Sequence, residues 1–284
     1  MEQNRALFVL INGKPENRIS ALDRGLHYGD GLFETISVIN SNPCLWQNHI
    51  SRLLHGCARL NIPTPDPDQL LAECSSVSES NERCVVKIIM TRGEGGSGYL
   101  PPQSATPQRI VYSMPWPERP HSWWEKGVKT RICSTRLGSM PALAGMKHLN
   151  RLPQVMARAE WSDPDIAEGV MLDAHDRVIE GTMSNIFMCK DGSLYTPDLS
   201  ENGVAGVMQG VVAEVANELN IPLHVTDITP DMLRQADGVF LTNSVIGIWP
   251  VNEVAGRMFD PLAIDQELVG KVMERGFSGH DQQL

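Results

Sequence analysis

Lys147 is the residue whose surroundings best suit a reactive amine. It follows the uncharged stretch LGSMPALAGM and precedes HLNRL. A lysine beside small apolar residues is partly desolvated, which lowers its pKa towards the neutral amine that Schiff-base chemistry needs. Taken alone, the residue is weak evidence, because most lysines are solvated surface residues.

Three further features could form a set with Lys147. Arg52 lies between the core-type residues Ile50 and Leu53 of a helical pattern, where it could bind a phosphate or simply face solvent. The run from Gly203 to Gly206 precedes a helix, so its backbone N–H groups could approach an anion, although such turns also occur without ligands. Glu180 ends an apolar strand and needs a partner, either a protonated pyridine nitrogen or an arginine.

The apolar pattern predicts the elements that must position these residues. Continuous or β-branched runs predict strands over 32–39, 84–91 and 109–114, and helical spacing predicts helices over 49–60, 149–161 and 206–219. The proline-rich run 115–127 shows neither the helical nor the strand spacing of apolar residues. We therefore expect a small N-terminal α+β domain at 1–117, a connector at 118–127 and a larger C-terminal domain at 128–284.

Composition narrows the class of protein. The net charge of −10 argues against a nucleic-acid or anionic-membrane partner, and no apolar stretch approaches membrane-spanning length. The six cysteines are scattered and show no C-x-x-C pair or metal-ligand spacing, so no metal is expected. These features predict a cytoplasmic enzyme or binding protein whose anionic ligand is held by local positive groups.

Several runs, in order and spacing, resemble the class IV pyridoxal-phosphate family, which includes branched-chain aminotransferases, D-amino acid aminotransferases and aminodeoxychorismate lyases. The runs extend along nearly the whole chain: INGK, DRGLHYGDGLFET, HISRL, TRGEGG, LAGMKHLNRL, VIEGTMSNIF, GVAGVMQG and LTNSVIGIWPV. The resemblance implies a two-domain, fold-type-IV enzyme of the D-amino acid aminotransferase type. Its larger domain would have a β-barrel-like core of α/β character, and the enzyme would form a homodimer acting on a small-molecule substrate.

By this resemblance, pyridoxal 5′-phosphate is the cofactor and Lys147 is its Schiff-base lysine. Arg52 would bind the phosphate, and Glu180 would pair with the pyridinium nitrogen, so that the ring acts as an electron sink. The remaining phosphate ligands would be the backbone N–H groups of Gly206, Val207 and Met208 and the hydroxyl of Ser244.

The runs KHLNRL and GGSGY resemble the lyases more than the aminotransferases. The implied reaction converts 4-amino-4-deoxychorismate to 4-aminobenzoate and pyruvate, a step of folate synthesis. Candidate substrate-binding residues are Phe33, Tyr99, Arg109 and Arg151.

Two positions depart from the lyase pattern, because Ser97 and Gln209 stand where many lyases have arginine. Two other functions therefore stay open. One is a transaminase of the same fold acting on D-amino or branched-chain amino acids, and the other is a non-catalytic binding protein.

Overall fold

The computed structural model describes residues 8–79, 81–254 and 256–278. Its contacts divide the chain into two compact units. Unit 1 comprises 1–117, 147–150 and 277–284, and unit 2 comprises 118–146 and 151–276. The expected domains at 1–117 and 128–284 stay a prediction, and their ends at 1–7 and 279–284 lie outside the described residues. The units differ from those ranges chiefly because Lys147–Asn150 groups with unit 1.

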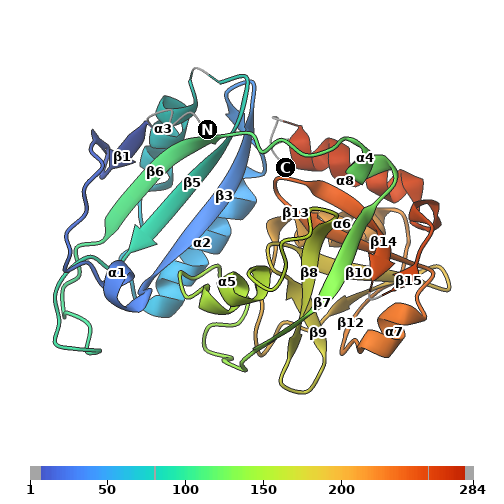
Figure 1. The fold of residues 1–284 in the computed structure, drawn as a ribbon. Helices are drawn as coiled ribbons and strands as arrows, with labels where there is room; N and C mark the ends of the chain where they lie inside the picture. The colour runs from blue at the N-terminus through green and yellow to red at the C-terminus, as the bar shows by residue number, and fades with distance from the viewer. Residues whose placement is uncertain (1–7, 80, 255, 279–284) are drawn as a thin grey trace. The chain divides into compact units, whose positions relative to one another are not determined.

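Unit 1 is built on a six-stranded antiparallel sheet (Figure 1). The strands, in spatial order, are β2 (Lys14–Pro15), β1 (Val9–Ile11), β6 (Gln108–Pro115), β5 (Arg83–Thr91), β3 (Gly31–Ile39) and β4 (Asn42–Pro43). The strands predicted over 32–39, 84–91 and 109–114 are thus confirmed as β3, β5 and β6.

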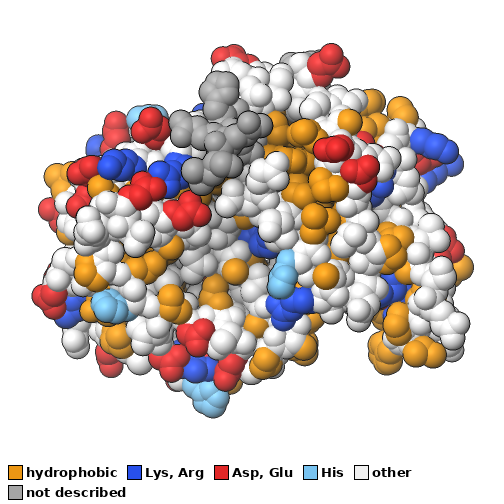
Figure 2. Space-filling model, turned by 180° about the vertical axis from the view of Figure 1, so that it is seen from behind, with side chains coloured by type: hydrophobic (Ala, Val, Ile, Leu, Met, Phe, Trp, Pro, Cys, Tyr) orange, Lys and Arg blue, Asp and Glu red, His pale blue; other side chains and the backbone are white. Residues whose placement is uncertain are grey.

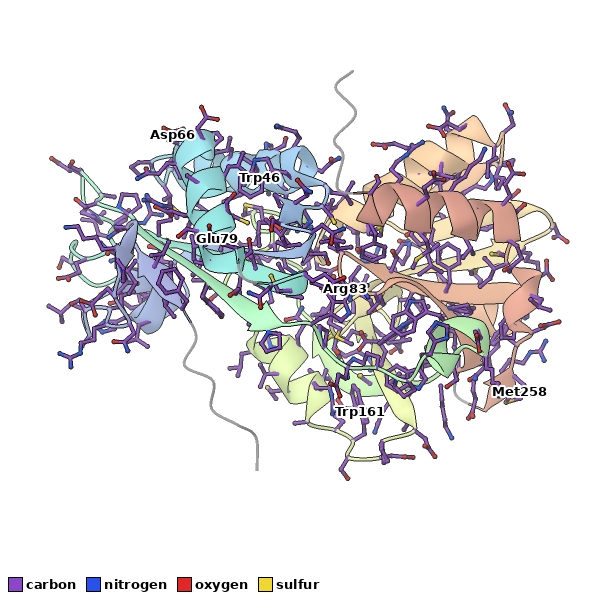
Figure 3. The ribbon with its side chains drawn as sticks, turned by 90° about the horizontal axis from the view of Figure 1, so that it is seen from above. Trp46, Asp66, Glu79, Arg83, Trp161 and Met258 are labelled. Atoms are coloured by element: carbon purple, nitrogen blue, oxygen red, sulfur yellow. The ribbon has the colours of Figure 1, made fainter. Side chains whose placement is uncertain are left out.

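Two helices cover one face of this sheet. They are α2 (Trp46–Leu60) and α3 (Pro67–Ser78), and Figure 3 labels the start of α2 at Trp46 and the two ends of α3 at Asp66 and Glu79. Leu32 packs beneath Gly56 of α2, where an added Cβ would lie 2.9 Å from Leu32. Side chains alternate along a strand, so Leu32, Glu34 and Ile36 face the helices while Phe33 faces the other way. A short helix, α1 (Arg24–Tyr28), precedes β3.

Unit 2 contains a nine-stranded mixed sheet that curls into a half barrel (Figure 1). Its strands are β12 (Leu223–Thr226), β11 (Ser193–Pro197), β10 (Asn185–Lys190), β13 (Gly238–Asn243), β14 (Gly247–Val254), β7 (Val128–Leu137), β8 (Ile166–Asp173) and β9 (Val178–Gly181), with β15 (Arg257–Met258) paired to β14. Its main apolar cluster includes the fully buried Trp249, Val239 and Leu241.

The helices of unit 2 are short. They are α4 (Ser122–Glu125), α5 (Leu152–Arg158), α6 (Val207–Glu218), α7 (Pro230–Arg234), the 3-10 turn Pro261–Ala263 and α8 (Gln266–Phe277), of which Phe277 groups with unit 1. The helix predicted over 206–219 is confirmed as α6.

The helix predicted over 149–161 is wrong at both ends, because α5 covers only Leu152–Arg158. Leu149 is engaged in strand pairing, since its N–H donates to the carbonyl of Gly31. Pro153 lies in the first turn of α5, where a proline suits a helix start. The apolar pattern of 149–161 therefore covers both the end of the segment that pairs with β3 and the helix α5.

The surface mixes charges of both signs. On the face drawn in Figure 2, Lys and Arg side chains are interspersed with Asp, Glu and apolar groups rather than gathered into one basic patch. Within residues 8–79, 81–254 and 256–278, no helix combines the length and apolarity needed to cross a membrane.

Candidate active site

Lys147 is placed by pairing with the edge of β3. Its carbonyl accepts a hydrogen bond from the N–H of Phe33 at 2.9 Å, and His148 forms an isolated bridge with Leu32. Opposed residues share a face of a sheet, so Lys147 and Phe33 point the same way. The Lys147 Nζ lies 4.6 Å from the centre of the Phe33 ring.

Glycine is required where this segment meets β3. A Cβ on Gly31 would lie 2.2 Å from the carbonyl oxygen of Met90 and 2.8 Å from Leu149. Gly29 has a φ of +63°, and a Cβ there would lie 2.8 Å from the Asn150 side chain, which donates to the Gly29 carbonyl. The GDGLF run therefore lets the lysine segment approach closely.

A second lysine, which the sequence reading missed, lies over the same ring. Lys87 of β5 has its Nζ 4.9 Å from the centre of Phe33. Burial lowers the pKa of Lys87, and burial also raises the pKa of its cross-strand neighbour Tyr112. None of the ion pairs found in the described ranges involves Lys87. Its signal in the sequence was a lone charge inside the apolar run CVVKIIM.

Arg52 is held on α2 by a buried carboxylate. Its Nε donates to Glu34 Oε1 at 2.8 Å and its Nη2 to Glu34 Oε2 at 2.5 Å. Burial alone would raise the pKa of Glu34, but the charge and hydrogen bonds of Arg52, with a hydrogen bond from His49, lower it to about 2. Glu34 therefore fixes the orientation of the Arg52 guanidinium.

His49 completes this group. Its Nδ1 lies 2.7 Å from Glu34 Oε2. Burial lowers the pKa of His49, and Glu34 offsets that effect only in part. A neutral ring that donates from Nδ1 has an acceptor at Nε2, and this buried Nε2 has no hydrogen-bond partner among the described residues.

In unit 2, Glu180 of β9 is buried and held by two N–H donors. Its Oε2 accepts from the backbone N–H of Val204 at 2.8 Å, and its Oε1 accepts from Gln154 Nε2 at 3.0 Å. Gln154, on α5, is another residue that the sequence reading missed. The isolated glutamate expected from the sequence thus has a defined orientation.

The turn before α6 has the features of an anion site. Gly206 is the N-cap, and the N–H groups of Val207 and Met208 lie in the first turn, where a helix offers them no internal acceptor. An added Cβ on Gly206 would lie 1.9 Å from Asn185 Oδ1. Gln209 accepts a hydrogen bond from the Gly206 N–H, so the residue that replaces the lyase arginine caps the helix.

Ser244 lies in a turn shaped by its neighbour. Asn243 Oδ1 accepts from the N–H groups of Val245 and Ile246 at 2.8 and 2.9 Å, and its Nδ2 donates to the carbonyl of Met183. Met183 also donates its N–H to the buried Glu168, whose carboxylate accepts from the hydroxyls of Thr182 and Ser184. Burial raises the pKa of Glu168. Side chains therefore fix both the turn at 243–246 and the loop at 182–184.

The other substrate-binding candidates are Arg109 and Tyr99 of unit 1 and Arg151 of unit 2. Arg109 is on the helix-covered face of the sheet, opposite to Phe33, and it forms a two-pronged ion pair with Glu73 of α3. Because Glu73 already pairs with its guanidinium, a substrate carboxylate would have to compete with Glu73, and the predicted substrate contact of Arg109 stays a prediction. Tyr99 is 87% exposed, with the Tyr28 ring 5.4 Å away, and Arg151 donates to the carbonyl of Met146.

The part of the chain that the structure describes contains no group of three or more His, Cys, Asp or Glu side chains placed to hold a metal ion. All six cysteines are free thiols, and five of them are buried.

Comparison with known proteins gives a consistent result. The family model for amino-transferase class IV matches residues 31–254. An aminodeoxychorismate lyase from Vibrio harveyi is 38% identical over 245 residues, which are 86% of this chain and 90% of the relative. The crystal structure of a 4-amino-4-deoxychorismate lyase from Pseudomonas aeruginosa is 45% identical with a TM-score of 0.87, covering 94% of this chain and 97% of that one. A putative branched-chain-amino-acid aminotransferase from Methanocaldococcus jannaschii is 29% identical, covering 94% and 93%.

Proposed function

Because the chain belongs to the class IV aminotransferase family, we propose that it is a pyridoxal-phosphate-dependent lyase that converts 4-amino-4-deoxychorismate to 4-aminobenzoate and pyruvate. The observation that carries this proposal is the similarity to two lyases along nearly the whole chain, at higher identity than to the aminotransferase. The resemblance of the KHLNRL and GGSGY runs to the lyases supports the same choice.

The family depends on pyridoxal phosphate, and this chain has residues that fit the cofactor. Lys147 supplies an amine for the aldehyde, and Glu180 supplies a carboxylate for the ring nitrogen. Gly206, Val207 and Met208 supply first-turn N–H groups for the phosphate. Arg52 and Ser244 complete the proposed phosphate ligands. When bound, the cofactor supplies an electron-withdrawing ring that takes up the electrons released at the substrate.

Lys147 would then carry the protons of the reaction. With substrate bound, the Nζ of Lys147 would remove the proton from the carbon that bears nitrogen. The same Nζ later returns a proton to the departing three-carbon fragment. Phe33 supports this role because its ring lies 4.6 Å from Nζ and shields one side of the amine from water.

Lys87 is a candidate for binding a substrate carboxylate. Its Nζ lies over the same Phe33 ring as the Nζ of Lys147. Burial disfavours the unpaired ammonium, so an anion bound beside Lys87 would stabilise it. It could therefore supply the positive charge that Ser97 lacks. Tyr99, Arg151 and Arg109 remain proposed substrate contacts, although a substrate would have to compete with Glu73 for the Arg109 guanidinium.

We also propose a homodimer. The outer side of α5 exposes Leu152, Val155 and Met156 at 66%, 61% and 56%, which is unusual for apolar residues on one short helix. A second copy of the chain would cover them. A partner subunit would equally account for the exposure of Tyr99, which is a proposed substrate contact. The expected cytoplasmic location stays a prediction.

A transaminase is the competing function, and amino-group transfer distinguishes it. The purified enzyme would be incubated with 2-oxoglutarate and either D-alanine or L-leucine, with glutamate as the measured product. The lyase proposal predicts glutamate formation far slower than 4-aminobenzoate formation. Rapid glutamate formation would contradict it, and a non-catalytic protein would give neither product.

A further inference from the structure

We propose that Gln154 is a positioning residue, which holds the Glu180 carboxylate in its anionic form and fixes its orientation. This inference rests on the proposed pairing of Glu180 with the cofactor ring nitrogen. Gln154 donates from Nε2 to Glu180 Oε1 at 3.0 Å, while the Val204 N–H donates to Oε2 at 2.8 Å. These two donors bind different oxygens, so together they constrain the plane of the carboxylate.

The burial pattern of α5 indicates that the side-chain amide of Gln154 is buried for a specific interaction. Gln154 is only 9% exposed, whereas Leu152, Val155 and Met156 on the same helix are more than half exposed. A helix normally buries its apolar side chains and exposes its amides. The Oε1 of Gln154 is buried with no hydrogen-bond partner in the part of the chain that the structure describes. Packing alone does not explain an amide here, because an apolar side chain would avoid that unpaired atom.

A neutral donor suits this position better than a charged one. An arginine or lysine would form an ion pair with Glu180 and compete with a protonated ring nitrogen for its charge. An apolar residue would remove a hydrogen bond from the anion and so favour the neutral acid. An amide donor stabilises the anion and adds no charge, so Gln154 does not neutralise the carboxylate that the ring nitrogen would meet.

The test measures the protonation of the cofactor ring nitrogen, using enzyme loaded with ¹⁵N-labelled pyridoxal phosphate. The ¹⁵N chemical shift is followed against pH in the wild type, Gln154→Met, Gln154→Glu and Glu180→Gln. Gln154→Met keeps the size of the side chain but cannot donate, so we expect the midpoint of ring-nitrogen protonation to fall by about one pH unit. The dissociation constant of the cofactor should also rise, because binding would then have to order a Glu180 side chain that Gln154 no longer fixes. Gln154→Glu should shift the midpoint in the same direction, because a second carboxyl would share a proton with Glu180.

Gln235→Met, which changes an exposed amide of the same unit, is the matched control and should leave the midpoint unchanged. Thermal unfolding of each apo variant, followed by circular dichroism, reports whether a change in the midpoint results from loss of the fold. An unchanged midpoint in both Gln154 variants, with a shift in Glu180→Gln, would overturn the role of Gln154 and leave that of Glu180 intact. If Glu180→Gln also left the midpoint unchanged, the proposed role of Glu180 would fail as well.

Discussion

At the scale of single residues, two lysines with different proposed roles lie over the ring of Phe33 on one face of the sheet. Lys147 reaches the ring from the segment paired with β3, and Lys87 reaches it from β5. The sequence singled out Lys147 through its uncharged surroundings and its family-like run. It gave no comparable signal for Lys87, because the significance of a lone lysine in an apolar strand depends on which residues face it across the sheet.

Replacing Lys87 by Met should weaken substrate binding more than it slows the chemistry. A lost hydrogen bond to a charged carboxylate corresponds to a rise in KM of about tenfold or more, with kcat changed much less. Steady-state kinetics of 4-aminobenzoate formation measure this. Lys87→Arg keeps the charge and should retain most of the affinity, and Lys129→Met at the surface should change nothing. An unchanged KM in Lys87→Met would exclude the proposed contact.

Glu34 should make the stability of the protein depend on acid. Its folded pKa of about 2 lies below the ordinary 4.5, so it stabilises the fold fully above pH 4.5 and loses this effect as pH falls towards 2. The full difference corresponds to roughly 3 kcal/mol. The free energy of unfolding in urea should therefore differ between wild type and Glu34→Gln, and this difference should narrow as pH falls below 4.5. A difference independent of pH would show that Glu34 is not the titrating group.

At the scale of elements, the sequence predicted the central strands of unit 1, α2 and α6 well, because their apolar periods are long and uninterrupted. It failed for α5, where apolar residues that pair with β3 run directly into a helix. It also omitted α3 and α8. The expected two-domain fold of the family is confirmed by the similarity to the solved lyase structure.

The start of α6 allows a matched pair of glycine substitutions. An added Cβ at Gly206 would meet Asn185 Oδ1 at 1.9 Å, whereas a Cβ at Gly210 of the same helix meets nothing within 4 Å. Gly206→Ala should therefore displace the first turn and weaken cofactor binding about tenfold or more. Gly210→Ala should leave binding unchanged and stabilise the helix by up to about 1 kcal/mol. Equal cofactor affinity in both variants, measured by titration of the apo enzyme, would argue against a phosphate site at this turn.

At the scale of the whole molecule, the exposed side of α5 predicts the assembly. Val155→Glu should convert the proposed dimer to a monomer, because a charge buried in an apolar interface is not compensated. Size-exclusion chromatography with light scattering measures the mass directly. Val225→Glu on β12 places the same charge at a similarly exposed valine and should keep the dimer. A dimer that persists in Val155→Glu would locate the interface elsewhere.

The family could be recognised from the sequence because its motifs are local runs of residues in a fixed order. The partners of Arg52 and Glu180 could not, because Glu34 and Gln154 meet them only through folding across 18 and 26 positions. The ion pair of Arg109 with Glu73 likewise became apparent only in three dimensions, because the two residues lie 36 positions apart.

The most direct test of the proposed function measures 4-aminobenzoate and pyruvate formed from enzymatically generated 4-amino-4-deoxychorismate. We expect both products in equal amounts with the wild type and with the surface control Lys129→Ala. With Lys147→Ala we expect neither product, and no cofactor fixed to the chain by borohydride reduction. Failure of the wild type to form 4-aminobenzoate, or undiminished turnover in Lys147→Ala, would contradict the proposed function.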